Sequence, residues 1–533
     1  MADWLCSRGL HSAEHAERFL NPRLSELSQP DGMLDRRAAA ERLARAIRAN
    51  ERIVVFGDYD CDGMTATAIL TEMLRALGGN VTPLLASRFD GGYGLSDAAL
   101  TRIVAQSPSL VVTCDCGSSD HPRLARLAEL GIDAIVVDHH LVPEQPLPAL
   151  AFLNPHRKEC GFAYKGLASC GLVLSLGGAV RTALDRKLDL RNWLDLVAIG
   201  TVADVAPLDG DNRALVRAGL RALADPKRPG LKALLRMAKL GDGLPLSSED
   251  IAFRIAPRLN APGRLGSPDV ALQLMLAQDA DTAESLAARL EQASTERRAV
   301  QDQLQLEAIE EITQQGYDTR PAIVLGRNGW NHGIVGIVAG RLAERFARPV
   351  VVFGFDGEHG RGSVRGPAGA RLHDALSRCE SKLVRFGGHQ AAAGAELEFG
   401  RMGEFREAFE RAVEALQQES RPQAVTSTPN LWLAAGDEPE RVFQDLLQLE
   451  PCGLTNPAPA LMVEAEVTAA RAVNGGHLKL DLELPGRRRL SAFGIALGER
   501  AGSLSGRVTL SGKLRADRYR GGTAVELFVE RIL

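Results

Sequence analysis

This sequence of 533 residues has few aromatic residues and no long uncharged apolar run. Its acidic and basic residues are nearly equal in number. No apolar stretch approaches about 18 residues without a charge, which argues against a membrane-spanning helix. The N-terminus MADWLCSRGL lacks the basic-then-apolar order of a signal peptide. The eight cysteines show neither metal-ligand spacing nor a secretory context, so we expect reduced thiols. These absences predict a cytoplasmic protein with no membrane partner.

The net charge of −4 gives the chain no overall attraction to a polyanion, so a nucleic-acid site would depend on local basic patches. Charge is unevenly distributed. From Ala460 onward there are 12 Lys and Arg residues against 8 Asp and Glu, a net charge of +4, which leaves −8 for the remainder. This asymmetry predicts that a polyanion meets the C-terminal part of the chain.

Three aspartates at alternate positions, Asp58, Asp60 and Asp62, follow an apolar run in the segment RIVVFGDYDCDGMTATA. Residues 53–56 are typical of a buried strand and residues 64–77 of a helix. Alternation along an extended backbone would place the three carboxylates on one side of the sheet. Their repulsion favours a bound divalent cation, and hard oxygen ligands indicate magnesium or manganese rather than zinc. An acidic turn or a set of helix caps is the alternative interpretation.

Strand-like and helix-like runs alternate between about residues 50 and 160, which predicts an α/β fold with a parallel sheet covered by helices on both faces. Ligands of such sheets gather at the carboxyl ends of the strands. Further acidic or histidine motifs follow apolar runs: Asp115 in TCDCG, Asp138 with His139 and His140 in VVDHH, and Asp204 in VADV. A lone Asp-His-His is a weak signal. The four motifs, each expected at the end of a strand, together contain six or seven ligands. Two cations about 3.5 to 4 Å apart require that number.

The length predicts three or more domains. Residues 281–315 contain neither glycine nor proline and carry apolar residues at helical spacing, which predicts a connecting helix roughly 50 Å long. A second α/β unit follows, and alternating runs such as HLKLDLEL predict a small C-terminal barrel or antiparallel sheet. The expected order is an N-terminal segment (1–48), a first α/β domain (49–280), the connecting helix (281–316), a second α/β domain (317–418) and the barrel (429–533).

These motifs together resemble the DHH phosphoesterase superfamily, and in particular its single-strand-specific 5′ to 3′ DNA exonucleases. The resemblance runs from about Phe19 to the C-terminus and rests on FLNPRLSEL, FGDYDCDG, SRFDGGYGL, TCDCG, VVDHH, NPHRKEC, LASCG, GTVADVAPL, APRLNAPGRL, GWNHGIVGIVAGRL, GRGSVRG, FGGHQAAAG and LEPCGLTNP. It implies a DHH domain, a DHH-associated (DHHA1) domain and an oligonucleotide-binding (OB-like) barrel. It also implies two Mn²⁺ or Mg²⁺ ions as cofactors.

By this resemblance, the catalytic residues are Asp58, Asp60, Asp62, Asp115, His139, His140 and Asp204. The first ion would be held by Asp58, Asp60 and Asp115, and the second by Asp62, Asp115, His139 and Asp204, so that Asp115 bridges the two. His140 would touch the phosphate or orient a ligand. Asp138 would not bind a cation itself but would fix the orientation of a histidine that lies at the ions.

The resemblance and residue chemistry also indicate substrate contacts. Guanidinium groups match phosphate oxygens, which makes Arg88, Arg258 and Arg264 candidate phosphate clamps. Ser363 and Arg365 would bind the 5′-terminal phosphate, and His389 would contact the substrate. Tyr93, Phe89 and Trp330 are candidates for stacking on bases. In the tail, the expected basic face comprises Arg487, Arg488, Arg489, Lys513, Arg515, Arg518 and Arg520, with Tyr519 or Phe528 for stacking.

The function implied is a two-metal exonuclease that releases mononucleotides from the 5′ end of single-stranded DNA in recombination and repair. A helicase and a single-strand-binding protein are implied partners, and we expect a monomer. One alternative is a phosphodiesterase for short oligonucleotides, cyclic dinucleotides or a phosphoanhydride, although such substrates need neither a long helix nor a basic tail. Another is a catalytically silent replication scaffold, but every expected metal ligand is present here.

Overall fold

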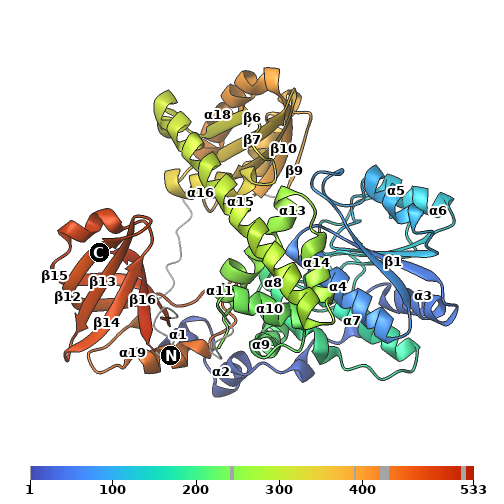
Figure 1. The fold of residues 1–533 in the computed structure, drawn as a ribbon, viewed down its shortest axis with the longest axis horizontal. Helices are drawn as coiled ribbons and strands as arrows, with labels where there is room; N and C mark the ends of the chain where they lie inside the picture. Colours follow the sequence, from blue (N-terminus) through green and yellow to red (C-terminus); the bar gives the residue numbers. More distant parts are fainter. Residues whose placement is uncertain (1, 241–244, 389, 391, 420–430, 518–523) are drawn as a thin grey trace. The chain divides into compact units, whose positions relative to one another are not determined.

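The computed structural model describes residues 2–240, 245–388, 390, 392–419, 431–517 and 524–533. The chain divides into two compact units (Figure 1). The first comprises Met1–Leu259, Ala271–Ala287 and Thr426–Leu533, and the second comprises Asn260–Val270 and Ala288–Val425. Among the helices described, none is both long and apolar enough to cross a membrane.

The first unit is built on a five-stranded parallel sheet with the order β2-β1-β3-β4-β5. Its strands are β1 (Arg52–Gly57), β2 (Asn80–Leu85), β3 (Leu110–Cys114), β4 (Asp133–Val137) and β5 (Ala151–Leu153). In register, Gly57 of β1 lies opposite Cys114 of β3, which in turn pairs with Val137 of β4. The segments that follow β1, β3 and β4 therefore leave the sheet at one edge, as the sequence predicted.

Helices cover both faces of this sheet, which confirms the predicted architecture (Figure 1). On one face, Val54 and Phe56 of β1 share a core with Ile103 of α5 (Asp97–Ala105) and Leu124 of α6 (His121–Glu129). The other face meets α4, which contacts β1 and β2 and packs on α7 and α8. The remaining helices of this part are α1 (Ala2–Ser7), α2 (Ala13–Leu20), α3 (Arg36–Arg48), α4 (Cys61–Ala76), α7 (Ser169–Ala183), α8 (Leu194–Ala203), α9 (Gly210–Ala224), α10 (Pro229–Met237), α11 (Ser248–Asp250), α12 (Ala256–Leu259) and α14 (Asp269–Leu276).

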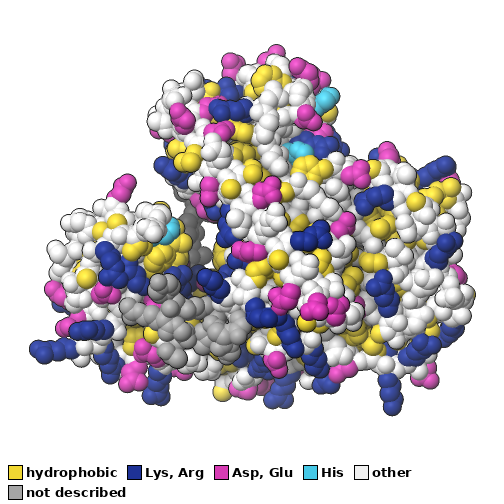
Figure 2. Space-filling view, in the orientation of Figure 1, with side chains coloured by type: hydrophobic (Ala, Val, Ile, Leu, Met, Phe, Trp, Pro, Cys, Tyr) yellow, Lys and Arg dark blue, Asp and Glu magenta, His cyan; other side chains and the backbone are white. Residues whose placement is uncertain are grey.

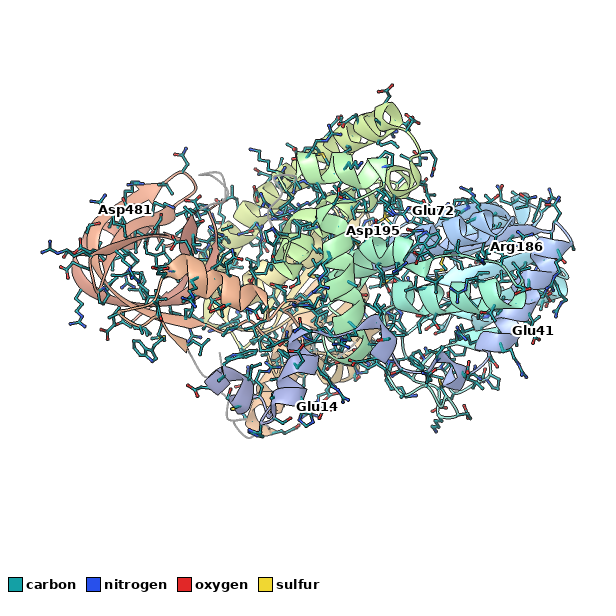
Figure 3. The ribbon with its side chains drawn as sticks, turned by 90° about the horizontal axis from the view of Figure 1, so that it is seen from below. Glu14, Glu41, Glu72, Arg186, Asp195 and Asp481 are labelled. Carbon is teal, nitrogen blue, oxygen red and sulfur yellow. The ribbon has the colours of Figure 1, made fainter. Side chains whose placement is uncertain are left out.

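A buried ion-pair cluster joins three of these helical segments. Arg228, just before α10, binds Glu72 of α4 and lies 3.2 Å from Asp195 of α8. Glu72 and Asp195 lie near one another in Figure 3. All three side chains are less than 20% exposed, so loss of one partner would leave a buried charge unpaired. The cluster therefore ties α4 and α8 to the segment that leads into α10.

The turn after β1 corrects the predicted placement of the three aspartates. β1 ends at Gly57, and α4 begins at Cys61 rather than at residue 64. Asp60 is the N-cap of α4, and Asp62 lies in its first turn, so strand alternation does not align them. A Cβ on Gly63 would lie 2.6 Å from the carbonyl oxygen of Asp58, so only glycine allows this tight strand-to-helix turn.

The C-terminal part of the first unit is the predicted barrel. Its sheet order is β11-β12-β13-β14-β16-β15, and pairing of β12 with β15 closes five of these strands into a barrel. Alternation is clearest in β13, where Leu478, Leu480, Leu482 and Leu484 point into the core. The elements are β11 (Leu431–Trp432), α19 (Pro439–Leu447), β12 (Leu461–Val473), β13 (His477–Leu484), β14 (Arg488–Gly494), β15 (Gly506–Ala516) and β16 (Val525–Ile532).

The second unit is a separate α/β module with the sheet order β6-β7-β8-β10-β9. Its elements are α13 (Ala261–Leu265), β6 (Ile323–Asn328), α16 (Val335–Phe346), β7 (Val350–Asp356), β8 (His359–Arg365), α17 (Leu372–Ser377), β9 (Arg385–Gly388), β10 (Ala392–Glu398) and α18 (Met402–Glu419). The predicted long helix is α15 (Ala280–Gln315), with 36 residues. Its Leu304, Ala308 and Ile312 pack into the core of this module. The domain bounds expected from the sequence remain a prediction.

Candidate metal centre

All seven residues predicted to be catalytic converge at the carboxyl edge of the first sheet. Oxygen and nitrogen atoms of Asp58, Asp60 and Asp115 lie within 4.8 Å of one another, and so do those of Asp62, His139 and Asp204. A third, overlapping group joins Asp115, His139 and His140. Asp115 and His139 each belong to two groups, which is the arrangement that a pair of cations sharing a ligand requires.

Asp62 is held by the N-terminus of α7. Its Oδ2 accepts a hydrogen bond of 2.7 Å from the Ser169 amide, and its Oδ1 accepts one of 3.0 Å from the Cys170 amide. Amides at a helix N-terminus favour an anion, so they keep this carboxylate in place. The Ser169 hydroxyl also lies 3.1 Å from Asp115 Oδ1. On the opposite side, a Cβ on Gly200 of α8 would lie 2.9 Å from Asp62 Oδ1, so α8 approaches closely only because glycine stands there.

Asp60 and Asp58 are placed by the turn between β1 and α4. Asp60 Oδ1 accepts hydrogen bonds of 3.1 Å from the amides of Asp62 and Gly63, which caps the helix. Asp58 is 2% exposed, yet its Oδ1 has no hydrogen-bond partner among the described residues. A buried carboxylate oxygen without a donor is costly, and a cation is the partner that would satisfy it.

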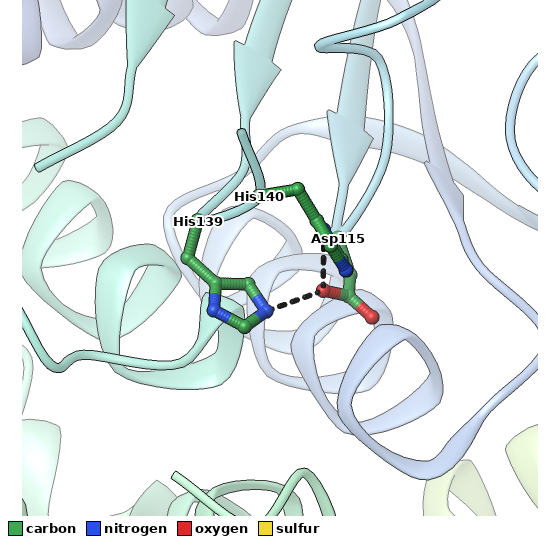
Figure 4. A group of neighbouring side chains, drawn as sticks. All are labelled: Asp115, His139 and His140. Atoms are coloured by element: carbon green, nitrogen blue, oxygen red, sulfur yellow. Dashed lines mark ion pairs between the residues drawn. The ribbon is translucent and has the colours of Figure 1, made fainter. Parts of the chain in front are cut away.

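The two histidines have different surroundings (Figure 4). His139 Nε2 lies 3.2 Å from Asp115 Oδ1 and 3.8 Å from Asp204 Oδ2, but it makes no hydrogen bond within the described chain. His140 Nδ1 instead lies 2.7 Å from Asp138 Oδ1. Asp138 also accepts hydrogen bonds from the amides of Ser118, His139 and His140. His139 is thus free to bind a cation, whereas Asp138 holds His140.

Electrostatics without a cation are unfavourable at this edge. Burial raises the pKa of Asp115, and the carboxylates of Asp62 and Asp60 raise it further. The same causes raise the pKa of Asp204 to about 9. Burial also raises the pKa of Asp58 and lowers that of His139. Such carboxylates ionise at neutral pH only with compensating positive charge, so the donor set suits divalent cations.

Asp138 and His140 form a pair that behaves differently. Burial alone would raise the pKa of Asp138, but the hydrogen bond and charge of His140, with the contributions of Ser118 and His139, together outweigh it and keep that pKa low. Burial alone would lower the pKa of His140, yet the hydrogen bond with Asp138 and the negative charges of Asp138, Asp204 and Asp60 together raise it to about 9. This pair therefore fixes an imidazole ring at the edge of the cluster without adding a net charge to it.

Family models match three stretches of the chain: the DHH family N-terminal domain at residues 52–201, the DHHA1 domain at 320–417 and the RecJ OB domain at 432–531. Curated proteins named single-stranded-DNA-specific exonuclease RecJ are similar over almost the whole chain. That of Escherichia coli K12 is 35% identical over 99% of this chain and 94% of its own length. That of Bacillus subtilis 168 is 34% identical over 99% of this chain and 67% of its own length.

The chain belongs to the RecJ family. Solved RecJ structures share its fold. The crystal structure of RecJ in complex with Mn²⁺ from Thermus thermophilus is 30% identical, with a TM-score of 0.81, over 99% of this chain and 75% of that one. RecJ from the same organism in complex with Mg²⁺ has a TM-score of 0.75 at 29% identity, over 99% of this chain and 73% of that one.

The arginines predicted as phosphate clamps in this RecJ-family chain have distinct environments. Arg88 stacks over the ring of Tyr59 at 3.9 Å, and its charge lowers the raised pKa of Asp58, which places it beside the metal centre. Arg258 lies in α12 and donates to the carbonyl of Arg254. Arg264 belongs to the second unit, where it donates to the carbonyl of Gly333. Arg88 thus lies beside a carboxylate of its own unit.

Ser363 and Arg365 of β8 lie together in the second unit, facing the first turn of α16. An added Cβ on Gly336 would meet Ser363 Oγ at 3.1 Å and Arg365 Nη2 at 3.6 Å. A hydroxyl, a guanidinium and a helix N-terminus with no side chain in the way make a suitable site for a phosphate. His389, predicted as a further substrate contact, lies outside the described residues.

The residues predicted to stack on bases or to form a basic face differ in their exposure and pairing. Trp330 is wrongly predicted to stack on bases, because it is 7% exposed, fills the core under α15 and donates its Nε1–H to Glu307.

The basic residues predicted in the barrel are partly paired. Lys513 pairs with Glu249 and Glu530, and Arg515 pairs with Glu526, so their charges are offset. Arg487 and Arg489 are exposed. Arg518, Tyr519 and Arg520 lie outside the described residues. On the face in Figure 2, basic and acidic side chains are interspersed.

Two functional contacts were not foreseen. The Ser169 hydroxyl at Asp115 was missed because LASCG stood out only as part of the family resemblance. The Tyr93 hydroxyl lies 3.1 Å from His140 Nδ1 and 3.1 Å from the carbonyl oxygen of Asp115. Tyr93 was considered only as a platform for bases, since a tyrosine beside glycines in a loop carries no signal of a hydrogen bond to a distant strand end.

Proposed function

We propose that this protein is a two-metal-dependent 5′ to 3′ exonuclease that degrades single-stranded DNA to 5′-mononucleotides in DNA recombination and repair. The observation that carries the proposal is the overlap of the acidic and histidine groups at Asp115, in a chain of the RecJ family. The relatives are named single-stranded-DNA-specific exonucleases, and the similar solved structures are complexes with Mn²⁺ or Mg²⁺.

The proposed first ion is bound by Asp58, Asp60 and Asp115, and the second by Asp62, Asp115, His139 and Asp204. Two orphaned buried atoms support this fit, because Asp58 Oδ1 and His139 Nε2 have no hydrogen-bond partner among the described residues. Hard carboxylate oxygens with one or two imidazoles suit Mn²⁺ and Mg²⁺. The groups of Asp58, Asp60 and Asp115, and of Asp62, His139 and Asp204, are each compact enough to close on one ion.

A pair of cations held by these residues would supply a more acidic bound water for attack on the scissile phosphate and positive charge opposite the leaving oxygen. The chain's own residues do the positioning. Asp138 orients the His140 ring through a bond of 2.7 Å, which leaves the other ring nitrogen for a phosphate oxygen. The α7 amides hold Asp62, and the cap on α4 holds Asp60. No serine or cysteine nucleophile takes part.

In this proposal Arg88, Arg258 and Arg264 contact phosphates of the strand, and Ser363 with Arg365 binds the 5′-terminal phosphate. The approach of these last two side chains to Gly336, at the N-terminus of α16, supports the latter assignment. His389 remains a proposed substrate contact. An enzyme that binds a terminal phosphate starts at an end, which accounts for exonuclease rather than endonuclease action.

The setting of the reaction belongs to the same proposal. Single-stranded DNA is the substrate, a helicase would supply it, and a single-strand-binding protein would cover it. We also propose a monomer that acts in the cytoplasm, where the DNA lies. The domain bounds 1–48, 49–280, 281–316, 317–418 and 429–533 remain those proposed from the sequence.

An assay with 5′-phosphorylated, end-labelled single strands and Mn²⁺ tests the function. We expect labelled mononucleotide as the first product, little action on duplex or on circular single strands, and loss of at least about 100-fold of activity in Asp115→Asn. Asp302→Asn, an exposed carboxylate of α15, is the matched control and should retain full activity. Full activity in Asp115→Asn would contradict the metal assignment. Equal turnover of dinucleotides would favour a phosphodiesterase for short substrates.

A further inference from the structure

The loop between β2 and α5, residues 86–96, makes contacts with three parts of the metal centre. Tyr93 Oη lies 3.1 Å from both His140 Nδ1 and the Asp115 carbonyl. Arg88 of the same loop stacks at 3.9 Å over the ring of Tyr59, the residue directly after Asp58. One loop thus reaches Asp115, His140 and the neighbour of Asp58, which follow three different strands.

Hydrogen-bond chemistry determines which way each proton points. The Asp115 carbonyl can only accept, so the single proton of the Tyr93 hydroxyl goes to it. Tyr93 Oη is then an acceptor toward His140, which requires a proton on Nδ1. Asp138 Oδ1, 2.7 Å from the same nitrogen, requires that proton as well. Two independent partners therefore hold the same ring nitrogen, and the Nε2 side of the ring is left for the substrate.

The ring of Tyr93 supports this geometry. Its centroid lies 5.5 Å from that of His140 at 69°, an edge-to-face contact that restricts rotation of the imidazole. The other side of His140 meets His139, with ring centroids 4.6 Å apart. Tyr93 as a whole is 43% exposed, although its hydroxyl is engaged by both partners.

The loop is held in place from behind. Asp120 Oδ2 accepts a hydrogen bond of 2.9 Å from the Leu95 amide, and Leu95 is 2% exposed. Arg102 lies 3.6 Å from Asp90 and donates to the Leu85 carbonyl. Gly94 has a positive φ of 76°, and a Cβ there would meet Asp120 Oδ2 at 2.6 Å. These contacts hold the loop, and therefore Tyr93, in a defined position.

We propose that Tyr93 is a positioning residue of the reaction: its hydroxyl aligns His140 on the substrate phosphate and locks the Asp115 peptide that carries the shared metal ligand. This inference rests on the proposed function and deepens it. Asp115 has a left-handed backbone, with φ of 63°, so its carbonyl points where a carbonyl after a regular strand would not. The hydroxyl of Tyr93 is the donor that meets it.

Tyr93→Phe removes the hydroxyl and keeps the ring, which makes it the decisive variant. With single-stranded DNA and saturating Mn²⁺, we expect kcat to fall about tenfold, with KM for DNA and the apparent Mn²⁺ affinity each within twofold of wild type. Tyr317→Phe, a buried tyrosine in the second unit, is the matched control and should change none of these. Tyr93→Leu removes the edge contact too and should lower kcat further.

Three outcomes would overturn the inference. An unchanged kcat in Tyr93→Phe would show that the hydroxyl does not matter. A raised KM with normal kcat would assign Tyr93 to substrate binding alone. A matching loss of Mn²⁺ affinity would mean that it supports the ions and not His140.

A second measurement keeps the inference separate from the proposed function. The ¹⁵N spectrum of ring-labelled histidine, with the His140 signals assigned by their loss in His140→Gln, reports the hydrogen bonding of each ring nitrogen in the Mg²⁺-loaded protein. We expect the Nδ1 signal of His140 to shift between wild type and Tyr93→Phe, because the variant removes one of its two partners. Identical His140 signals in both would defeat the inference even if the protein is an exonuclease. Absence of exonuclease activity with shifted signals would instead defeat the proposed function.

Discussion

Val205, directly after the proposed ligand Asp204, has a left-handed backbone with φ of 59° although it is β-branched and 65% exposed. Such a residue is strained, by about 1 to 2 kcal/mol, and little packing compensates for it here. Strain of this kind is often retained where it positions a functional group. Val205 turns the chain at the point where α8 delivers the Asp204 carboxylate.

We expect Val205→Gly to raise the free energy of unfolding of the metal-free protein by about 1 kcal/mol, because glycine adopts this conformation freely. Mn²⁺ affinity should fall, since Asp204 is then less firmly placed. Thermal unfolding and Mn²⁺ titration measure the two effects. Ala347→Gly, another left-handed residue at φ of 51°, should also stabilise but leave Mn²⁺ affinity unchanged. A destabilised Val205→Gly would show that the valine packs after all.

Single residues were predictable where their chemistry is distinctive. Aspartates and histidines behind apolar runs were found from the sequence, because few other roles require so many ligands in one chain. Tyr93 and Ser169 were not, because their roles rest on hydrogen bonds to residues that are 22 and 47 positions away for Tyr93 and 54 positions away for Ser169. No local pattern records such a bond.

Among the elements, the N-terminus of α7 has the most direct effect on the centre. Ser169→Ala keeps the amide that binds Asp62 and removes the hydroxyl at Asp115 Oδ1. We expect Mn²⁺ affinity to fall about tenfold, as is usual when a group behind a ligand is lost. Calorimetric titration with Mn²⁺ measures it. Ser294→Ala, also a buried serine in a helix, should have no effect on affinity. An unaltered affinity in Ser169→Ala would show that this hydroxyl does not orient Asp115.

The anchor of the β2–α5 loop predicts a pH dependence. Burial raises the pKa of Asp120 to about 6, so the folded state binds this proton more tightly than the unfolded chain, with its pKa near 4. Asp120 therefore costs stability progressively as pH rises from about 4 to about 6. Asn keeps an acceptor for the Leu95 amide but cannot ionise. Asp120→Asn should thus match wild type below about pH 4 and be more stable by about 1 kcal/mol above about pH 7. A constant difference across this range in thermal unfolding would contradict the assignment.

The turn after β1 shows why element boundaries are hard to predict. Aspartates at alternate positions fit a strand end, but they fit an N-cap followed by a helical first turn equally well. Tertiary contacts decide between them, since α4 is held against β1 and packed on α7 and α8. For the same reason Asp204 was expected after a strand, whereas it is the C-cap of α8. An apolar run does not distinguish a buried strand from a buried helix.

Across the molecule, the architecture was the most predictable feature. The parallel sheet, the long helix, the second α/β module and the barrel all follow from periodicity and from the absence of glycine and proline over residues 281–315. Side-chain pairing across distant parts was not predictable. Lys513 and Arg515 look like a basic face in sequence, but Glu249, Glu526 and Glu530 neutralise them in the fold.

Binding of a polyanion to the barrel is therefore best tested at its exposed arginines. Replacing Arg487 and Arg489 by Ala should weaken binding to single-stranded DNA of any sequence and reduce the slope of log K against log salt by about 1.4. Fluorescence anisotropy over a salt series measures this slope. Arg37→Ala with Arg411→Ala makes the same charge change on exposed helices and should leave the slope as it is. Equal slopes in the two double variants would place the DNA elsewhere.

The direct test of a paired-cation centre is anomalous scattering from crystals grown with Mn²⁺. We expect two manganese peaks about 3.5 to 4 Å apart at the carboxyl edge of the first sheet, with the Asp115 carboxylate between them. One peak only, or two peaks that share no ligand, would contradict the two-metal mechanism.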